Sequence, residues 1–352
     1  MTENKSGIRI GIDLGGTKTE VIALESDNGK ELYRKRVPSP RDDYSATIQN
    51  MANLVKEAEA TLGRTGTVGV AIPGSIVRET GLVKNANSTW INHHPLDKDL
   101  GAALGRPVRT ENDANCFAVS EATDGAGAGK GVVFGVILGT GSGAGLVAHG
   151  KLIVGLNGIG AEWGHNPLPS PRVYAEPDMI EKLTQSFDKN APYEIGTTIY
   201  PGKTGTPEYF TTDMAWNEYP GEYCYCGRRG CKEMWIAGPG FKRDYQRVTG
   251  IEKSTHDIIA DAEAGEPKAV AALERYADRL ARSLGFVINL VDPDVIVLGG
   301  GMSNVNALYD MVPKIWEKYL FTDKCKTPLV PAHFGDSSGV RGAAWLWDKD
   351  GN

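Results

Sequence analysis

The chain has 352 residues, of which 41% are hydrophobic and 23% charged, and its formal net charge is -6. This length suits two domains better than one small core, and the acidic balance argues against a nucleic-acid partner, which would need a basic face. No apolar run is long enough to cross a bilayer, and residues 1–7 lack the apolar centre of a signal peptide. We therefore expect a cytoplasmic protein that binds neither nucleic acid nor a membrane.

The first third of the chain alternates between strand and helix patterns. Its predicted elements are strands over 8–12, 20–24, 67–72 and 108–110 and helices over 44–62 and 114–122. The strands are short β-type runs, and the longer helix carries apolar side chains at helical spacing. A glycine turn joins the first two strands into a hairpin. This alternation predicts an α/β domain.

A second copy of the opening pattern begins near residue 132. An apolar strand over 132–138 leads into a glycine turn over 139–143 and another strand over 145–148. The repetition predicts two related α/β halves that face a cleft, each presenting one phosphate loop to it. The elements predicted further along are a helix over 267–291, a strand over 295–298, a helix from about Asn304 and a last helix over 339–347.

The expected domains follow from this pattern. Residues 1–122 are expected to form a smaller domain, which a C-terminal helix within 338–349 joins, and residues 123–337 a larger one. Residues 167–221 interrupt the larger domain, because they are rich in proline, glycine and aromatic residues and contain one clear helical stretch, over 178–187. We expect an inserted surface segment there.

The glycine turns indicate nucleotide binding. Glycine has no Cβ, so the backbone N–H groups of such turns can approach phosphate oxygens closely. In the first turn, Thr17 and Thr19 can add hydroxyl donors, Lys18 can add charge, and Asp13 can hold Mg2+ through water. A plain hairpin turn is the alternative. The predicted ATP and Mg2+ residues are Asp13, Gly15, Gly16, Thr17, Lys18, Gly139, Thr140, Gly141, Gly299, Gly300 and Gly301.

The last three of these glycines, Gly299 to Gly301, follow a predicted strand and precede a predicted helix. They lack the Gly-x-Gly-x-x-Gly spacing of a dinucleotide fold. A flat shelf for an adenine or ribose fits them better, and a tight strand-to-helix turn is the alternative.

Asp113 is the candidate catalytic residue. It lies where the strand over 108–110 meets the helix over 114–122. A carboxylate at the mouth of a cleft can take the proton from a sugar hydroxyl that attacks the γ-phosphate of ATP. Asp113 can also be the N-cap of the helix, and the two roles are compatible.

The most specific local motif is the run Cys224-Tyr225-Cys226-Gly227-Arg228-Arg229-Gly230-Cys231. In a cytosolic protein, cysteines this close together indicate a metal site sooner than a disulfide. His165 can complete a Cys3His zinc site, although a long segment separates it from the cysteines. Glu162 and Glu233 lie close in sequence to these ligands, and together with an imidazole they could hydrogen-bond the hydroxyls of a sugar.

Together these motifs resemble those of the ROK (repressor, open reading frame, kinase) family. The matching residues are Asp13-x-Gly-Gly-Thr, Asn112-Asp113, Leu138-Gly-Thr-Gly, Glu162-x-Gly-His165 and the cysteine run with Glu233, and they cover the chain from residue 8 to about 347. The runs over 13–20, 83–90 and 336–347 are similar to the bacterial manno(fructo)kinase branch.

The resemblance implies a two-domain, actin-like, hexokinase-type ATPase fold with ATP and a sugar in the cleft. It implies Asp113 as the catalytic base, zinc bound by His165, Cys224, Cys226 and Cys231, and a homodimer. The sugar-contacting residues that it implies are Asn87, Asn112, Asp113, Glu162, His165 and Glu233. Fructose, phosphorylated at its 6-hydroxyl, is the expected substrate.

Other substrates and other functions are the alternatives. Another hexose (mannose or glucose) or an N-acetylhexosamine would suit the same motifs. The segment 166–223 is longer than the family pattern, which bears on the edge of the sugar pocket and on the fourth zinc ligand. A sugar-sensing repressor of this fold would need an N-terminal helix-turn-helix, for which the residues before Ile8 are too few. A zinc-binding module without catalysis would leave both glycine turns unexplained.

Overall fold

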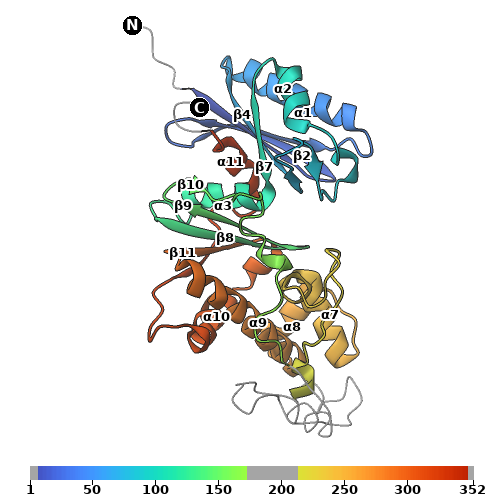
Figure 1. Cartoon of the computed structure of the whole chain (residues 1–352), viewed down its shortest axis with the longest axis vertical. Helices are drawn as coiled ribbons and strands as arrows, with labels where there is room; N and C mark the ends of the chain where they lie inside the picture. The colour runs from blue at the N-terminus through green and yellow to red at the C-terminus, as the bar shows by residue number, and fades with distance from the viewer. Residues whose placement is uncertain (1–6, 173–212, 348–352) are drawn as a thin grey trace.

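The computed structural model describes residues 7–172 and 213–347. Two five-stranded mixed sheets organise them (Figure 1). The first sheet has the order β3-β2-β1-β4-β7 and consists of β1 (Ile8–Leu14), β2 (Lys18–Glu25), β3 (Glu31–Pro38), β4 (Gly66–Ile72) and β7 (Val108–Asn112). In this sheet β1 pairs antiparallel with β2 and parallel with β4, and β7 extends the parallel part. A short hairpin of β5 (Ser75–Ile76) and β6 (Val83–Lys84) follows β4.

The second sheet repeats this plan. Its order is β10-β9-β8-β11-β12, and it consists of β8 (Val132–Leu138), β9 (Ser142–Ala148), β10 (Lys151–Leu152), β11 (Val295–Gly299) and β12 (Leu329–Pro331). Here β8 pairs antiparallel with β9 and parallel with β11. The predicted repetition of an α/β half that opens with an antiparallel hairpin is therefore confirmed.

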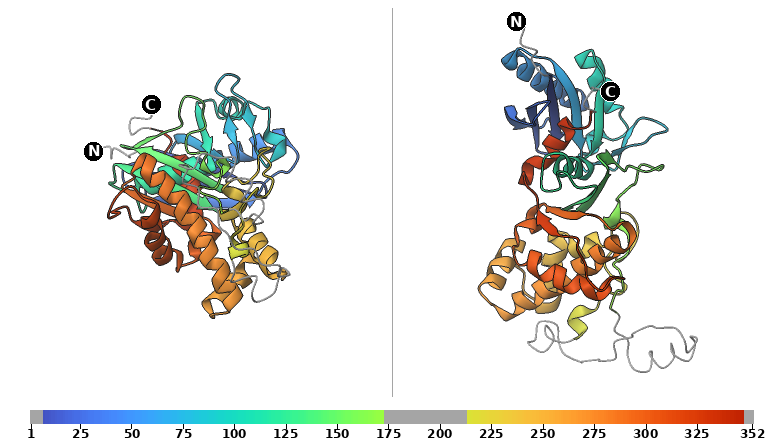
Figure 2. Two further views of the ribbon diagram at one scale, coloured as in Figure 1. Left: turned by 60° about the horizontal axis from the view of Figure 1, so that its bottom comes forward. Right: turned by 90° about the vertical axis from the view of Figure 1, so that its left-hand side faces the viewer.

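Helices alternate with the two sheets in layers (Figures 1 and 2). The outer face of the first sheet packs against α1 (Tyr44–Leu62) and α2 (Leu96–Leu104), and that of the second against α9 (Pro267–Val291) and α10 (Leu308–Trp316). Between the sheets lie α3 (Asp113–Thr123) and α11 (Ser338–Ala344), and the remaining α-helices described are α6 (Glu233–Ile236), α7 (Gly238–Thr249) and α8 (Thr255–Glu263). Within residues 7–172 and 213–347, none of the helices combines the length and apolar character that crossing a bilayer requires.

Strand alternation explains this layering. Along β8, Phe134 and Val136 join the hydrophobic cluster that contains α9, whereas Val133 joins the cluster of Phe117 and Ala118 on α3. Successive side chains of a strand point to opposite faces, so an almost wholly apolar strand can bury both of its faces. The apolar runs read from the sequence are the central strands for this reason.

Glycine allows α11 to lie very close to its neighbours. A Cβ at Gly11 of β1 would lie 2.0 Å from the carbonyl oxygen of Val340, and a Cβ at Gly342 would lie 1.6 Å from that of Cys116 on α3. A side chain does not fit at either position, so both require glycine. The helices α3 and α11 therefore cross with their backbones in contact.

Some element limits differ from the predicted ones. A 3-10 turn, Gly301–Asn304, comes before α10, so that helix begins only at Leu308. The last helix ends at Ala344 instead of Trp347. The sequence predicts α3 within the smaller domain, whereas α3 packs against β8 and β9 of the second sheet, and the domain limits stay a prediction.

The inserted segment is described only at its two ends, and the helix predicted over 178–187 lies outside the described residues. The backbone N–H of Glu218 donates to the Arg172 carbonyl (2.9 Å), and that of Arg172 donates to the Glu218 carboxylate (2.9 Å). The buried carboxylate also accepts hydrogen bonds from Arg279 (2.8 Å) and Arg282 (2.7 Å) of α9. Burial opposes its ionisation, yet these guanidinium groups hold the pKa of Glu218 below its ordinary value. Both ends of the segment are thus tied together on α9.

Candidate active site and metal centre

The turn between β1 and β2 is held in shape by hydrogen bonds. The N–H of Gly15 donates to the Lys18 carbonyl (3.0 Å), and the Ser39 hydroxyl donates to the Gly15 carbonyl (2.7 Å). Gly15 and Gly16 are half-buried, whereas Thr17 and Lys18 are exposed at the tip of the turn. A phosphate could therefore reach the two residues that were predicted to add a hydroxyl and a charge.

Thr19 does not belong to this exposed tip. Its side chain is buried, and its hydroxyl lies 2.8 Å from the hydroxyl of Ser39. The prediction that Thr19 offers a donor to phosphate is wrong, because Thr19 already lies within β2 and strand alternation turns its side chain into the protein.

Asp13, near the end of β1, lies in a group of acidic side chains. Burial raises the pKa of Asp13 to about 7, and the charges of Asp113 and Glu20 add to this effect while Arg36 opposes it. Such a carboxyl group is costly to ionise unless a cation lies beside it. The site therefore suits Mg2+, whose charge favours the ionised form.

Asn112, not Asp113, is the N-cap of α3. Its side-chain oxygen accepts hydrogen bonds from the N–H groups of Ala114 (2.9 Å) and Asn115 (3.4 Å), and its amide donates to the Gly74 carbonyl (3.0 Å). The N-cap alternative for Asp113 is therefore wrong, because its neighbour fills that role. Asp113 is the first helical residue instead, and its side chain is exposed.

The pKa of Asp113 is raised, chiefly by desolvation although its side chain is exposed and further by the charge of Glu162, against the hydrogen bonds from Ala114 and Asn112. A raised pKa makes the ionised carboxylate a stronger base, as proton abstraction from a hydroxyl requires. The charge of Asp113 acts on Asp13, and the charge of Glu162 acts on Asp113. β1, α3 and the turn that carries Glu162 therefore contribute to one acidic site.

The turn between β8 and β9 is bonded to Glu233, the first residue of α6. One carboxylate oxygen of Glu233 accepts a hydrogen bond from the N–H of Ser142 (2.9 Å), and a Cβ at Gly141 would lie 2.8 Å from the same oxygen. Gly139 closes the turn by donating to the Gly141 carbonyl (3.0 Å), and Thr140 is exposed at its tip. Glu233 thus connects the second glycine turn to the cysteine motif beside it.

Packing accounts for two of the three glycines at the end of β11, Gly299 to Gly301. A Cβ at Gly299 would lie 2.4 Å from the ring of Phe117 on α3, and Gly300 has a φ of 78° and would bring a Cβ to 2.7 Å from the backbone of Leu138. Gly301 faces open space. These contacts favour the strand-to-helix turn for Gly299 and Gly300 and leave Gly301 as the residue of this run that a nucleotide can approach.

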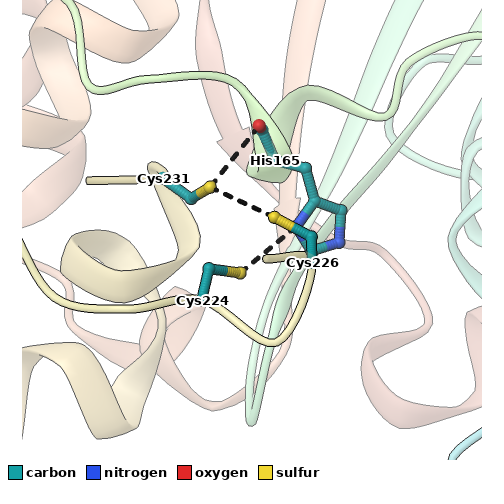
Figure 3. Close-up of side chains that lie close together, drawn as sticks. All are labelled: His165, Cys224, Cys226 and Cys231. Atoms are coloured by element: carbon teal, nitrogen blue, oxygen red, sulfur yellow. Dashed lines mark hydrogen bonds between the residues drawn. The ribbon is translucent and has the colours of Figure 1, made fainter. Parts of the chain in front are cut away.

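The predicted metal ligands converge. One donor atom each from His165, Cys224, Cys226 and Cys231 lies within 4.8 Å of all the others (Figure 3). His165 Nδ1 is 3.5 Å from the sulfur of Cys224, and the sulfurs of Cys226 and Cys231 are 3.5 Å apart. Tetrahedral zinc with bonds of about 2.3 Å separates its sulfur ligands by about 3.8 Å, so these donors fit zinc. His165 lies in η2 (Trp163–His165), and the cysteines precede α6.

Tyr225, which sequence reasoning passed over, completes this corner of the site. Its hydroxyl lies 2.9 Å from His165 Nε2, and the two rings meet edge to face with centroids 5.0 Å apart. Partial desolvation raises the pKa of Tyr225 to about 12 although much of the side chain is exposed, and the charges of Glu233, Cys224 and Glu162 contribute. The residue stands inside the cysteine motif, but only the folded chain brings its hydroxyl back to the histidine.

The ROK family matches residues 9–350. The chain belongs to the ROK family. It is 37% identical over 336 residues to the N-acetyl-D-glucosamine kinase of Yersinia pseudotuberculosis, an alignment that covers 96% of this chain and 97% of that relative.

Solved ROK structures show the same fold. The ROK hexokinase from Thermus thermophilus matches with a TM-score of 0.75 and 26% identity, covering 96% of both chains. A ROK glucokinase from Streptomyces griseus, solved with glucose and AMPPNP, matches with a TM-score of 0.67 and 25% identity, covering 97% of this chain and 99% of that one. The expected hexokinase-type fold is confirmed for this ROK chain, and its relatives support sugar-kinase activity.

Several of the residues predicted for this ROK chain interact with one another. The charge of Asp113 acts on Asp13, that of Glu162 acts on Asp113, and Glu233 bonds to the second glycine turn. Asn87 is exposed on the loop after β6, and its contact with a sugar stays a prediction.

Proposed function

We propose that the chain is an ATP-dependent kinase that transfers the γ-phosphoryl group to the 6-hydroxyl of N-acetyl-D-glucosamine. The observation that carries the reaction class is Asp113, which is released from capping, has a raised pKa and lies among the charges of Asp13 and Glu162. Relatives named N-acetyl-D-glucosamine kinase at 37% and 35% identity support this sugar over the fructose expected from sequence.

Asp113 acts as the general base. When the 6-oxygen of the sugar attacks the γ-phosphorus, its proton moves to the Asp113 carboxylate, the new O–P bond forms, and the bond to the β,γ-bridging oxygen breaks to release ADP. Thr17, Lys18 and those N–H groups of the two glycine turns that are not already bonded within the protein would hold the phosphates, and Asp13 would hold Mg2+. The bound Mg2+ neutralises the charge of the phosphate oxygens.

Zinc, held by His165 and the three cysteines, has a structural role in this proposal. It fixes η2, which follows Glu162, against the start of α6, which carries Glu233. Both carboxylates can then accept hydrogen bonds from sugar hydroxyls, and the predicted contact of His165 with the sugar stays a proposal. We also retain the homodimer as a proposal, which light scattering of the purified protein tests.

A coupled ADP-release assay tests the substrate and the reaction together. N-acetyl-D-glucosamine, fructose, mannose and glucose are compared, with ATP alone as the blank. The proposal expects the highest kcat/KM with N-acetyl-D-glucosamine. The highest value with fructose would support the substrate expected from sequence, and no sugar-dependent ADP release at all would overturn the kinase proposal.

A further inference from the structure

Tyr225 lies between two metal ligands but has no part in binding the metal. Its side chain is 79% exposed, yet its hydroxyl lies 2.9 Å from His165 Nε2. The neighbouring Tyr223 is 66% exposed, and the guanidinium of Arg229 lies 3.5 Å from the centre of its ring. Of these two tyrosines, Tyr225 alone is directed at the histidine, so its position in the site calls for a separate role.

The two nitrogens of His165 have different neighbours, and this fixes the direction of the hydrogen bond to Tyr225. Nδ1 faces the sulfur of Cys224 at 3.5 Å and is the nitrogen placed to bind zinc. The other nitrogen, Nε2, then carries the ring proton and donates it to the Tyr225 oxygen. The phenolic proton of Tyr225 is consequently free to point away from the histidine, toward a ligand.

The charged groups of the described chain that act most strongly on Tyr225 are all acidic, whereas the carbonyl oxygen of an amide substituent on a sugar needs a donor. Glu162 and Glu233 lie near enough for their charges to act on Tyr225. Ionised carboxylates only accept hydrogen bonds, so they suit sugar hydroxyls and repel a carbonyl oxygen. The carbonyl oxygen of an acetamido group only accepts as well, and the Tyr225 hydroxyl can donate to it.

We propose that Tyr225 is a specificity-determining residue, whose hydroxyl donates a hydrogen bond to the acetamido carbonyl oxygen of the sugar while it accepts one from His165. This inference rests on the proposed function, because it names the residue that distinguishes a 2-acetamido sugar from the plain hexose. A hexose with a hydroxyl at carbon 2 loses little binding affinity without Tyr225, because that hydroxyl can donate to the carboxylates.

The test compares Tyr225→Phe with wild type and with Tyr223→Phe as the matched control. Kinetics are measured with N-acetyl-D-glucosamine and with glucose, sugar binding is measured by calorimetry, and zinc by elemental analysis. We expect Tyr225→Phe to lower kcat/KM and binding affinity for N-acetyl-D-glucosamine about tenfold or more. We expect the values for glucose to stay within about twofold, and the zinc content and the Tyr223→Phe control to match wild type.

Three outcomes would overturn the inference, and they are distinguishable. Equal losses for both sugars, or a loss of zinc, would assign Tyr225 to the support of His165 instead of to the acetamido group. Wild-type selectivity in Tyr225→Phe would remove Tyr225 from sugar recognition while leaving the proposed function intact. A wild-type enzyme that binds and phosphorylates glucose but not N-acetyl-D-glucosamine would overturn both proposals.

Discussion

At the start of α3, two adjacent side chains divide capping and catalysis between them. Asn112 bonds to the first N–H groups of the helix and to the Gly74 carbonyl, so its amide is largely occupied. Asp113 accepts from the N–H of Ala114 (2.8 Å), and in the proposed mechanism its carboxylate takes the substrate proton. Because Asn112 caps the helix, the Asp113 carboxylate is fixed at the helix start and remains available to act as a base.

Asp113→Asn is therefore expected to lower kcat by at least about 100-fold, because an amide cannot accept the proton of the attacking hydroxyl. The amide oxygen can still accept from Ala114, so the melting temperature and circular dichroism spectrum should match those of wild type. The measurement is ADP release at saturating sugar and ATP. Substantial turnover by a folded variant would contradict the role of Asp113 as base.

Asp13→Asn is expected to stabilise the protein at alkaline pH in the absence of Mg2+. The pKa of Asp13 is raised from 3.8 to about 7 on folding, so the folded state binds the proton more tightly than the unfolded one, and stability is lost as pH rises through this interval. Removing the carboxylate should increase the free energy of unfolding by roughly 1–3 kcal/mol at pH 8 and by less at pH 5.

Urea denaturation at both pH values measures the effect, with the exposed Asp27→Asn as the control. The same variant should need much more Mg2+-ATP for turnover. A variant that is less stable than wild type at pH 8, or equally affected at both pH values, would contradict the raised pKa of Asp13 in the folded state.

Among the elements, the crossing of α3 and α11 is the contact that leaves least room for change. Gly342→Ala would place a Cβ 1.6 Å from the Cys116 carbonyl, so the helices must separate. We expect a loss of about 2–3 kcal/mol in the free energy of unfolding. Gly301→Ala, where a Cβ meets open space, is the control and should change stability little. Equal stability of both variants would show that the crossing can relax.

The sequence predicts the helices and strands whose apolar side chains recur at regular spacing. It misses β3, whose residues reflect its place at the edge of the sheet. The apolar runs of β1 and β8 predict buried strands because both their faces are covered. β3 is missed because it is an edge strand, where Arg34, Lys35 and Arg36 replace the apolar alternation.

Site residues show the same limit. Asn112 and Asp113 are both good N-caps, so local preference cannot say which one fills the position until the helix start is known. The cysteine spacing predicts a metal site directly. The contact between Tyr225 and His165 joins positions 60 residues apart and depends on how the intervening chain folds.

For the molecule as a whole, the metal centre joins the part of the chain that ends in η2 to the part that continues as α6. We expect about one zinc per chain. Cys226→Ser should lower zinc content and raise KM for the sugar more than KM for ATP, because Glu162 and Glu233 flank the metal ligands whereas Asp13 lies on the other sheet. Elemental analysis and kinetics with each substrate varied measure this.

Cys325→Ser is the matched control, because Cys325 lies outside the cluster. It should leave both zinc content and kinetics unchanged. A Cys226→Ser enzyme with no zinc but with wild-type KM for the sugar would show that sugar binding does not depend on the metal centre.

The tie between Arg172 and Glu218 has a consequence for how this protein can change over evolutionary time. The two ends of the inserted segment are bonded to each other, and for a flexible chain each doubling of the length between two such ends costs only about 0.6 kcal/mol in closure entropy. Because Glu218 is also held by Arg279 and Arg282, the contact between the two ends does not depend on the length of the chain between them. Insertions and deletions between residues 172 and 213 can therefore accumulate without drawing His165 away from the cysteines.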